Sequence, residues 1–232
     1  MSNLIVVAAS SDDVTLNGAE LVRQVTSKSN IQCFDNQAVR SRVLAVLETH
    51  PGRPAFFTGH GRPGFWRGTD KLPVVCSSTT PPALFEGRTM FALACWTGCH
   101  LGPFAAAYGA TYIGFNKPVS VIPASSKTAG VIMGFLDRLF GLIDSLAETK
   151  NVANFESGMT KLGEWGKREL FRYINQHRMY TEASVAVQEW SGDFLIYQQG
   201  RVTARKDRPL ASLLNSGSCV NACIEDGLPP PP

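Results

Sequence analysis

The chain has 232 residues, of which 44% are hydrophobic and 18% are charged, and its formal net charge at neutral pH is +3. A chain of this length can bury one good core, so we expect a single domain over residues 1–226 and a disordered Pro-rich tail at 227–232. The 22 Lys and Arg residues are scattered rather than gathered in one block, which argues against a nucleic-acid partner.

The first half of the chain alternates short apolar runs with segments whose apolar residues recur at helical spacing. The expected strands are 4–9, 31–34, 55–58, 89–94 and 111–115, and the expected helices are 19–27, 37–49, a short turn at 82–85, and 102–108. Residues 59–68 are predicted to form a Gly-rich loop. This alternation implies right-handed crossovers and an α/β fold, with a mostly parallel sheet flanked by helices.

The second half is predicted to be mainly helical, with one hairpin. Residues 125–148 and 155–177 have the spacing of long helices. The apolar tract 129–146 within the first is interrupted by three charged residues, so we expect no membrane span. In 183–190 Val185 and Val187 alternate with polar neighbours, and a turn at Ser191 leads into 193–198. That pattern indicates a carboxyl-terminal β-hairpin.

The amino terminus and the cysteines bear on the compartment. No basic residue precedes the first apolar run, and acidic residues follow it, which is unlike a signal peptide, so we expect a cytoplasmic protein. The six cysteines lie at positions 33, 76, 95, 99, 219 and 223. None forms Cys-x-x-Cys, and the four histidines do not complete a zinc-type pattern. We therefore expect no metal, no cofactor and reduced thiols.

Two apolar runs end abruptly in a reactive residue. Phe56-Phe57-Thr58 leads into Gly59-His60-Gly61, and Phe91-Ala92-Leu93-Ala94 leads into Cys95. Neighbouring parallel strands present their carboxyl ends at one edge of a sheet, so His60 and Cys95 should emerge side by side. A thiol is only a few per cent ionised at neutral pH and needs such a partner. A structural thiol, an ordinary loop histidine, and His100 as the base are the alternatives.

These residues resemble the caspase-like cysteine peptidases of clan CD, in which a hydrophobic block ends in His-Gly and a second block ends in Ala-Cys or Ser-Cys. Ala94-Cys95-Trp96-Thr97-Gly98, followed by the Gly-Ala and core strand of residues 108–114, is most similar to the bacterial CHAT-type branch. The resemblance covers roughly residues 4–124. Leu93 stands where animal caspases have Gln, so their specificity for Asp is not carried over.

The resemblance implies a role for each member of this pair. Cys95 is the expected nucleophile, which attacks a peptide carbonyl and forms a thioester. His60 is expected to help activate the thiol and to protonate the leaving amine. The backbone N–H groups of Gly61 and Cys95 are the expected oxyanion donors.

Substrate choice in this family depends on loops at the strand ends, here residues 10–13 and 116–121. Asp12 or Asp13 in the S1 pocket would favour a basic residue, whereas the alternative is that these acids cap the following helix or face water. Trp96 and Asn116 are further expected substrate contacts. Phe65 and Trp66 are either pocket walls or core residues.

The expected function is therefore a cysteine endopeptidase that cleaves a protein partner. Resemblance to bacterial relatives implies a pore-forming or toxin partner in antiviral defence or cell death, and a separate activator. Two alternatives stay open: a catalytically inactive caspase-like scaffold, and a cysteine hydrolase that acts on small amides or esters.

Overall fold

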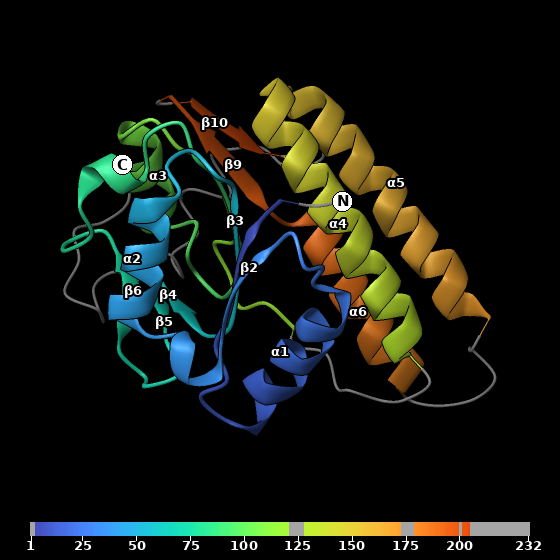
Figure 1. Cartoon of the computed structure of the whole chain (residues 1–232). Coiled ribbons are helices and arrows are strands. Elements are labelled where there is room, and N and C mark those ends of the chain that lie inside the picture. Colours follow the sequence, from blue (N-terminus) through green and yellow to red (C-terminus); the bar gives the residue numbers. More distant parts are fainter. Residues whose placement is uncertain (1–2, 121–127, 173–178, 200, 205–232) are drawn as a thin grey trace.

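The computed structural model describes residues 3–120, 128–172, 179–199 and 201–204, and their centre is a seven-stranded sheet (Figure 1). Its strands, in sheet order, are β10 (Arg201–Ala204), β9 (Leu195–Gln198), β8 (Thr111–Gly114), β7 (Thr89–Leu93), β3 (Ala55–Thr58), β1 (Ile5–Ala8) and β2 (Ile31–Phe34). The five strands from β8 to β2 are parallel, and β9 and β10 are antiparallel to their neighbours. The predicted α/β class with a mostly parallel sheet is confirmed.

Helices cover both faces of this sheet (Figure 1). One face carries α1 (Asp13–Val25), α4 (Ala129–Thr149), α5 (Val152–Phe171) and α6 (Met179–Gly192), and the other carries α2 (Arg40–Thr49) and α3 (Leu101–Ala107). Alternate residues of β1 belong to different cores: Val6 packs with the α1 and α4 side and Val7 with the α2 side. This alternation is the period of two that a strand buried on both faces imposes.

A small antiparallel sheet follows the strand that precedes His60. It consists of β4 (Gly61–Arg62), β5 (Phe65–Arg67) and β6 (Pro73–Cys76), so the prediction of a plain Gly-rich loop over 59–68 is wrong. Trp66 of β5 is fully buried, stacks on Phe57 at 4.8 Å between ring centroids, and donates from Nε1 to the Tyr112 hydroxyl at 2.9 Å. These contacts fix the small sheet against the large one.

Helix α1 begins at Asp13, six residues before the predicted start. Asp12 is its N-cap: Asp12 Oδ1 accepts from the Thr15 N–H at 2.9 Å, and Thr15 Oγ1 accepts from the Asp12 N–H at 3.2 Å. This reciprocal pair is a capping box, which stabilises a helix end. The sequence Leu16-Asn17-Gly18 had indicated a turn at this place. The stabilisation from the cap is larger than the helix-breaking tendency of Gly18.

The predicted hairpin over 183–198 is wrong in its first half. Residues 179–192 form α6, whose buried apolar side chains are Ala183, Ala186, Val187 and Trp190, at the spacing of one helix face, whereas Val185 is 46% exposed. The antiparallel pair is β9 with β10, one element later. Parts of three predicted segments lie outside the described residues: the start of the first long helix (125–127), the end of the second (173–177) and the tail (227–232).

The described cysteines differ in oxidation state. Cys33, Cys76 and Cys95 are free thiols, whereas Cys99 is disulfide-bonded, so the expectation that all thiols are reduced is wrong at Cys99. Cys219 and Cys223 lie outside the described residues. Within the described ranges, no helix combines the length and the apolar character that a membrane crossing requires.

Two short 3-10 turns complete the described elements. They are η1 (Asp35–Gln37), which precedes α2, and η2 (Pro82–Leu84), which precedes β7. The second confirms the predicted turn near Pro82. Other boundaries differ from the predicted ones by a few residues, which is usual where helix ends are assigned.

Candidate active site

Cys95 lies on a sharp turn that directly follows β7. The next residue, Trp96, has a backbone φ of +64°, a left-handed conformation that a bulky residue seldom adopts. Its N–H donates to the Lys117 carbonyl at 3.2 Å, and its own carbonyl accepts from the Cys99 N–H at 2.9 Å. Surrounding hydrogen bonds therefore hold an uncommon backbone conformation beside the thiol, as is frequent at functional sites.

Close packing explains the small residues of the segment after Cys95. The Gly98 N–H donates to the Phe115 carbonyl at 2.8 Å, and a Cβ at Gly98 would lie only 3.1 Å from the Phe115 backbone. Thr97 is fully buried and hydrogen-bonds to the Tyr112 hydroxyl. The Thr-Gly part of the motif thus anchors the cysteine loop to β8 and the residues after it.

His60 occupies the corresponding place on the neighbouring strand. Parallel strands β3 and β7 pair Thr58 with Leu93, and His60 and Cys95 each follow two residues later. Gly61, the next residue, lies so close to the cysteine loop that a Cβ there would be 2.5 Å from the Cys95 carbonyl oxygen. The backbones that carry the two expected oxyanion donors are therefore in direct contact, and only glycine permits that approach.

Asp12 contacts the His60 side chain. Asp12 Oδ2 lies 2.6 Å from His60 Nε2, and the two side chains are 44% and 35% exposed. Hydrogen bonds from the Thr15 N–H above all, and then from His60, lower the pKa of Asp12 to about 2. Because an ionised carboxylate can only accept, His60 Nε2 carries the hydrogen, which leaves Nδ1 as the acceptor nitrogen of a neutral imidazole.

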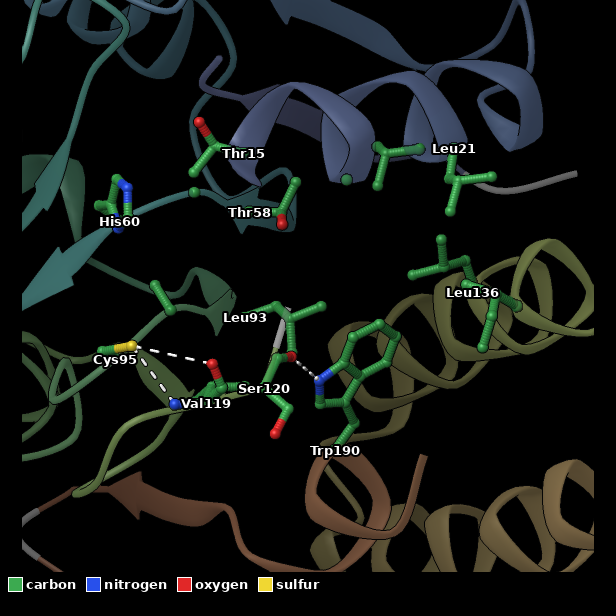
Figure 2. Close-up of a pocket in the computed structure, with 15 residues that line it drawn as sticks. Thr15, Leu21, Thr58, His60, Leu93, Cys95, Val119, Ser120, Leu136 and Trp190 are labelled. Carbon is green, nitrogen blue, oxygen red and sulfur yellow. Dashed lines mark hydrogen bonds between the residues drawn. The ribbon is translucent and has the colours of Figure 1, made fainter. Parts of the chain in front are cut away.

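The Cys95 thiol is half-buried. Burial raises its pKa above the ordinary value, and a hydrogen bond from the Val119 N–H to Sγ at 3.3 Å opposes that shift (Figure 2). The charge of Glu189 raises the pKa further. The resting thiol is therefore protonated at neutral pH, and a base must accept its proton before or during attack.

His60 and Cys95 line one pocket, whose cavity volume is about 40 Å³ (Figure 2). The carboxyl ends of β3 and β7 supply its reactive end, and helices α1, α4 and α6 supply its other walls. In Figure 2 His60 and Cys95 lie at one end of the pocket, and Leu21, Leu136 and Trp190 at the other. A mostly apolar lining with a few polar groups at one end is typical of a substrate site.

The other predicted substrate contacts do not line this pocket. Asp13 is the exposed first residue of α1, Trp96 makes the turn after Cys95, and Asn116 is buried in the loop after β8. Asp12 caps α1 and contacts His60, which matches the capping alternative for this residue. His100 precedes α3 and is likewise not part of the lining.

Helix α6 and the residue after it contribute to the site without a local signal in the sequence. Trp190 donates from Nε1 to the Ser120 carbonyl at 3.1 Å, and Glu189 Oε2 accepts from the Ser120 N–H at 2.8 Å. Lys117 Nζ donates a hydrogen bond to Asp193 Oδ2 at 2.6 Å and forms an ion pair with it. These contacts hold segment 117–120, which in turn contacts Cys95 through Val119. They join residues about 70 positions apart, and no local pattern indicates them.

No protein-family model matches the chain, and no curated protein matches its sequence. Among solved structures, the chain is similar to the complex of the pro- and mature domains of RgpB from Porphyromonas gingivalis, with a TM-score of 0.41 and 15% sequence identity. The similarity covers 81% of this chain and 46% of that chain, so the chain spans less than half the length of the protein it matches.

Proposed function

We propose that this protein is a cysteine endopeptidase whose nucleophile is Cys95 and whose acid–base residue is His60. The observation that supports it best is the common pocket: both residues lie two positions beyond a paired position of adjacent parallel strands and line one cavity. Thiol-dependent acyl transfer requires a base near the nucleophile, and adjacent strand ends bring these two residues to the same cavity.

In the first step His60 Nδ1 accepts the Cys95 proton while Sγ attacks the carbonyl carbon of the scissile peptide bond. The resulting oxyanion is stabilised by the backbone N–H groups of Gly61 and Cys95. The C–N bond then breaks, and the leaving amine takes the proton from His60. The products are a thioester between Cys95 and the acyl part of the substrate, and a free amine.

In the second step water attacks the thioester carbonyl while His60 accepts a proton from that water. The C–S bond breaks, the acyl part leaves as a carboxylic acid, and the Cys95 thiolate recovers the proton from His60. Each proton that His60 accepts is returned within the same half-reaction, so the side chains present complete the cycle.

Asp12 is a positioning residue in this mechanism. Its carboxylate accepts from His60 Nε2, which orients the ring with Nδ1 free and stabilises the imidazolium that forms transiently. Asp12 is itself held by the α1 cap, so the start of this helix fixes the histidine.

The test is cleavage of a peptide library by wild type and by Cys95→Ala, with labelling by a peptidyl acyloxymethyl ketone. We expect the wild type to be labelled at Cys95 and to cleave, and the variant to do neither. Cys76→Ser is the matched control, because Cys76 is a free thiol buried in β6, away from the pocket. Cleavage or labelling that persists in Cys95→Ala contradicts the proposal.

We also propose, from the resemblance of residues 4–124 to CHAT-type peptidases, that the natural substrate is a protein partner. A pore-forming or toxin protein of a bacterial defence system, with a separate activator, is the partner that this resemblance favours. Comparison of new protein amino termini in cells that express wild type or Cys95→Ala tests this. Turnover of small amides or esters with no new protein termini favours a small-molecule hydrolase instead.

A further inference from the structure

The far wall of the pocket is apolar. It is formed by buried side chains from α1, β7, α4 and α6, namely Leu21, Val22, Leu93, Ile132, Leu136 and Trp190. All six belong to the main core on this face of the sheet, so their positions are set by core packing. The pocket is therefore formed before any substrate binds.

No Asp, Glu, Lys or Arg is among the pocket-lining residues within the described part of the chain. The acids nearest to it have other partners: Asp12 contacts His60 and Thr15, and Glu189 contacts Ser120 and is 3.6 Å from Lys117. A cationic or anionic side chain that entered this cavity would lose hydration, and no Asp, Glu, Lys or Arg of the described lining would offset that loss. The site thus disfavours charged occupants of either sign.

Leu93 connects this apolar wall to the nucleophile. It is the last residue of β7 and belongs to the core against which the Cys95 side chain packs. The substrate residue whose carbonyl is attacked, the P1 residue, carries its side chain on the carbon next to that carbonyl. With the carbonyl at Cys95 Sγ, the adjoining cavity beside Leu93 is the space that a P1 side chain can reach.

We propose that this pocket is the S1 subsite and selects peptides with an uncharged apolar P1 side chain, such as Leu, Met or Phe. The inference rests on the proposed peptidase function. It replaces the expectation that Asp12 or Asp13 selects a basic residue. Burial of roughly three more carbon atoms in the pocket predicts about a tenfold to hundredfold preference for P1 Leu over P1 Ala.

The first experiment uses peptides that differ only at P1, with Leu, Met, Phe, Ala, Lys, Arg and Asp compared by kcat/KM. We expect the apolar residues to exceed Lys, Arg and Asp by at least about tenfold. Cleavage at Lys, Arg or Asp with equal or higher kcat/KM overturns this inference and leaves the peptidase intact. Failure to cleave any of the peptides, or cleavage that Cys95→Ala retains, overturns the peptidase proposal and the subsite with it.

Gly18 provides a sharper test. It lines the pocket on the same α1 face as Thr15 and Leu21, and a Cβ added there would meet nothing within 4 Å. The backbone at Gly18 therefore has room for a Cβ. Gly18→Phe places a ring at the pocket lining and should lower kcat/KM for P1 Leu at least about tenfold, with a much smaller loss for P1 Ala. An equal loss for both substrates overturns the S1 assignment.

The matched control is Asn17→Phe, which adds the same side chain at an exposed neighbouring position of α1 outside the pocket lining. It should leave the ratio of P1 Leu to P1 Ala cleavage unchanged. Gly18→Ala should raise the thermal unfolding midpoint, because alanine favours a helix more than glycine. A selective loss in Gly18→Phe with an unchanged midpoint therefore reports blockage of the pocket and not misfolding.

Discussion

The two sides of the pocket are built differently. The reactive side consists of strand ends: β3 and β7 carry His60 and Cys95 at matching positions, and the residues responsible lie within a few positions of the end of their strand. The helical side consists of core residues from α1, α4 and α6, which are far apart in the chain. Chemistry is thus encoded locally, whereas the shape of the substrate cavity depends on packing across the whole domain.

This difference separates two kinds of mutational effect. The His60 side chain is partly exposed, so its replacement should change the rate with little effect on stability. The helical wall is part of the core, so large changes there should affect the free energy of unfolding as well as substrate choice. The following predictions test this separation, from the largest expected effect to the smallest.

Replacement of His60 by Ala should lower kcat/KM by about 10²–10⁴ through loss of proton transfer. The His60 side chain is 35% exposed and its hydrogen-bond partner Asp12 is 44% exposed, so the free energy of unfolding should change by less than about 1 kcal/mol. Peptide cleavage and urea unfolding of the same preparations check both parts. A fall in unfolding free energy large enough to account for the whole loss of kcat/KM would contradict the proposed separation of reactivity from stability.

His100→Gln is the control for this variant. His100 lies in the loop after Cys95 but outside the pocket lining, and its Nδ1 is buried without a hydrogen-bond partner among the described residues. Its kcat/KM should stay within about threefold of wild type, as expected for a residue away from the reacting groups. A loss in His100→Gln as large as in His60→Ala would assign the base to His100.

The same contrast explains how much of the molecule could be predicted from sequence. Buried parallel strands and the residues at their ends leave local signals, so β3, β7 and the expected pair at positions 60 and 95 could be located. The helix at Ala183–Trp190 could not, because Val185 and Val187 alternate like a strand and only the packed core shows the helical face. The contact of Trp190 with Ser120 depends on the tertiary fold.

Asp12→Asn should lower kcat about threefold to tenfold, because the negative charge that stabilises the His60 imidazolium is lost from an exposed pair. Asparagine caps helices as well as aspartate does, so α1 should remain intact. Helical content by circular dichroism and kcat measured together separate the two roles of the residue. Asp12→Ala is the comparison variant: it removes the cap as well and should cost about 1 kcal/mol of stability.

Glu189→Gln tests the helical wall through the reactivity of the thiol. Glu189 raises the pKa of Cys95, and glutamine can still accept from the Ser120 N–H. Removal of the charge should therefore lower the thiol pKa and speed alkylation of Cys95 by iodoacetamide at pH 7–8. Mass spectrometry of labelled Cys95 over a pH series gives the result, and buried Cys33 in the same samples serves as the internal control. A slower reaction in the variant would contradict the assigned charge effect.

The smallest effect is expected in the pH dependence of stability at the start of α1. The folded-state pKa of Asp12 is lowered to about 2 from 3.8, chiefly by the Thr15 N–H, so the unfolded chain binds this proton more readily. The stabilisation is therefore fully present above about pH 4 and is lost as pH falls toward 2. Asp12→Asn has no such titration, so the difference in urea-unfolding free energy between wild type and variant should shrink steadily over this range. Because the Asp12 carboxylate is 44% exposed, solvent screens this stabilisation and the change with pH should be small. A difference in unfolding free energy that stays constant from pH 5 to pH 2 would show that the cap does not depend on charge.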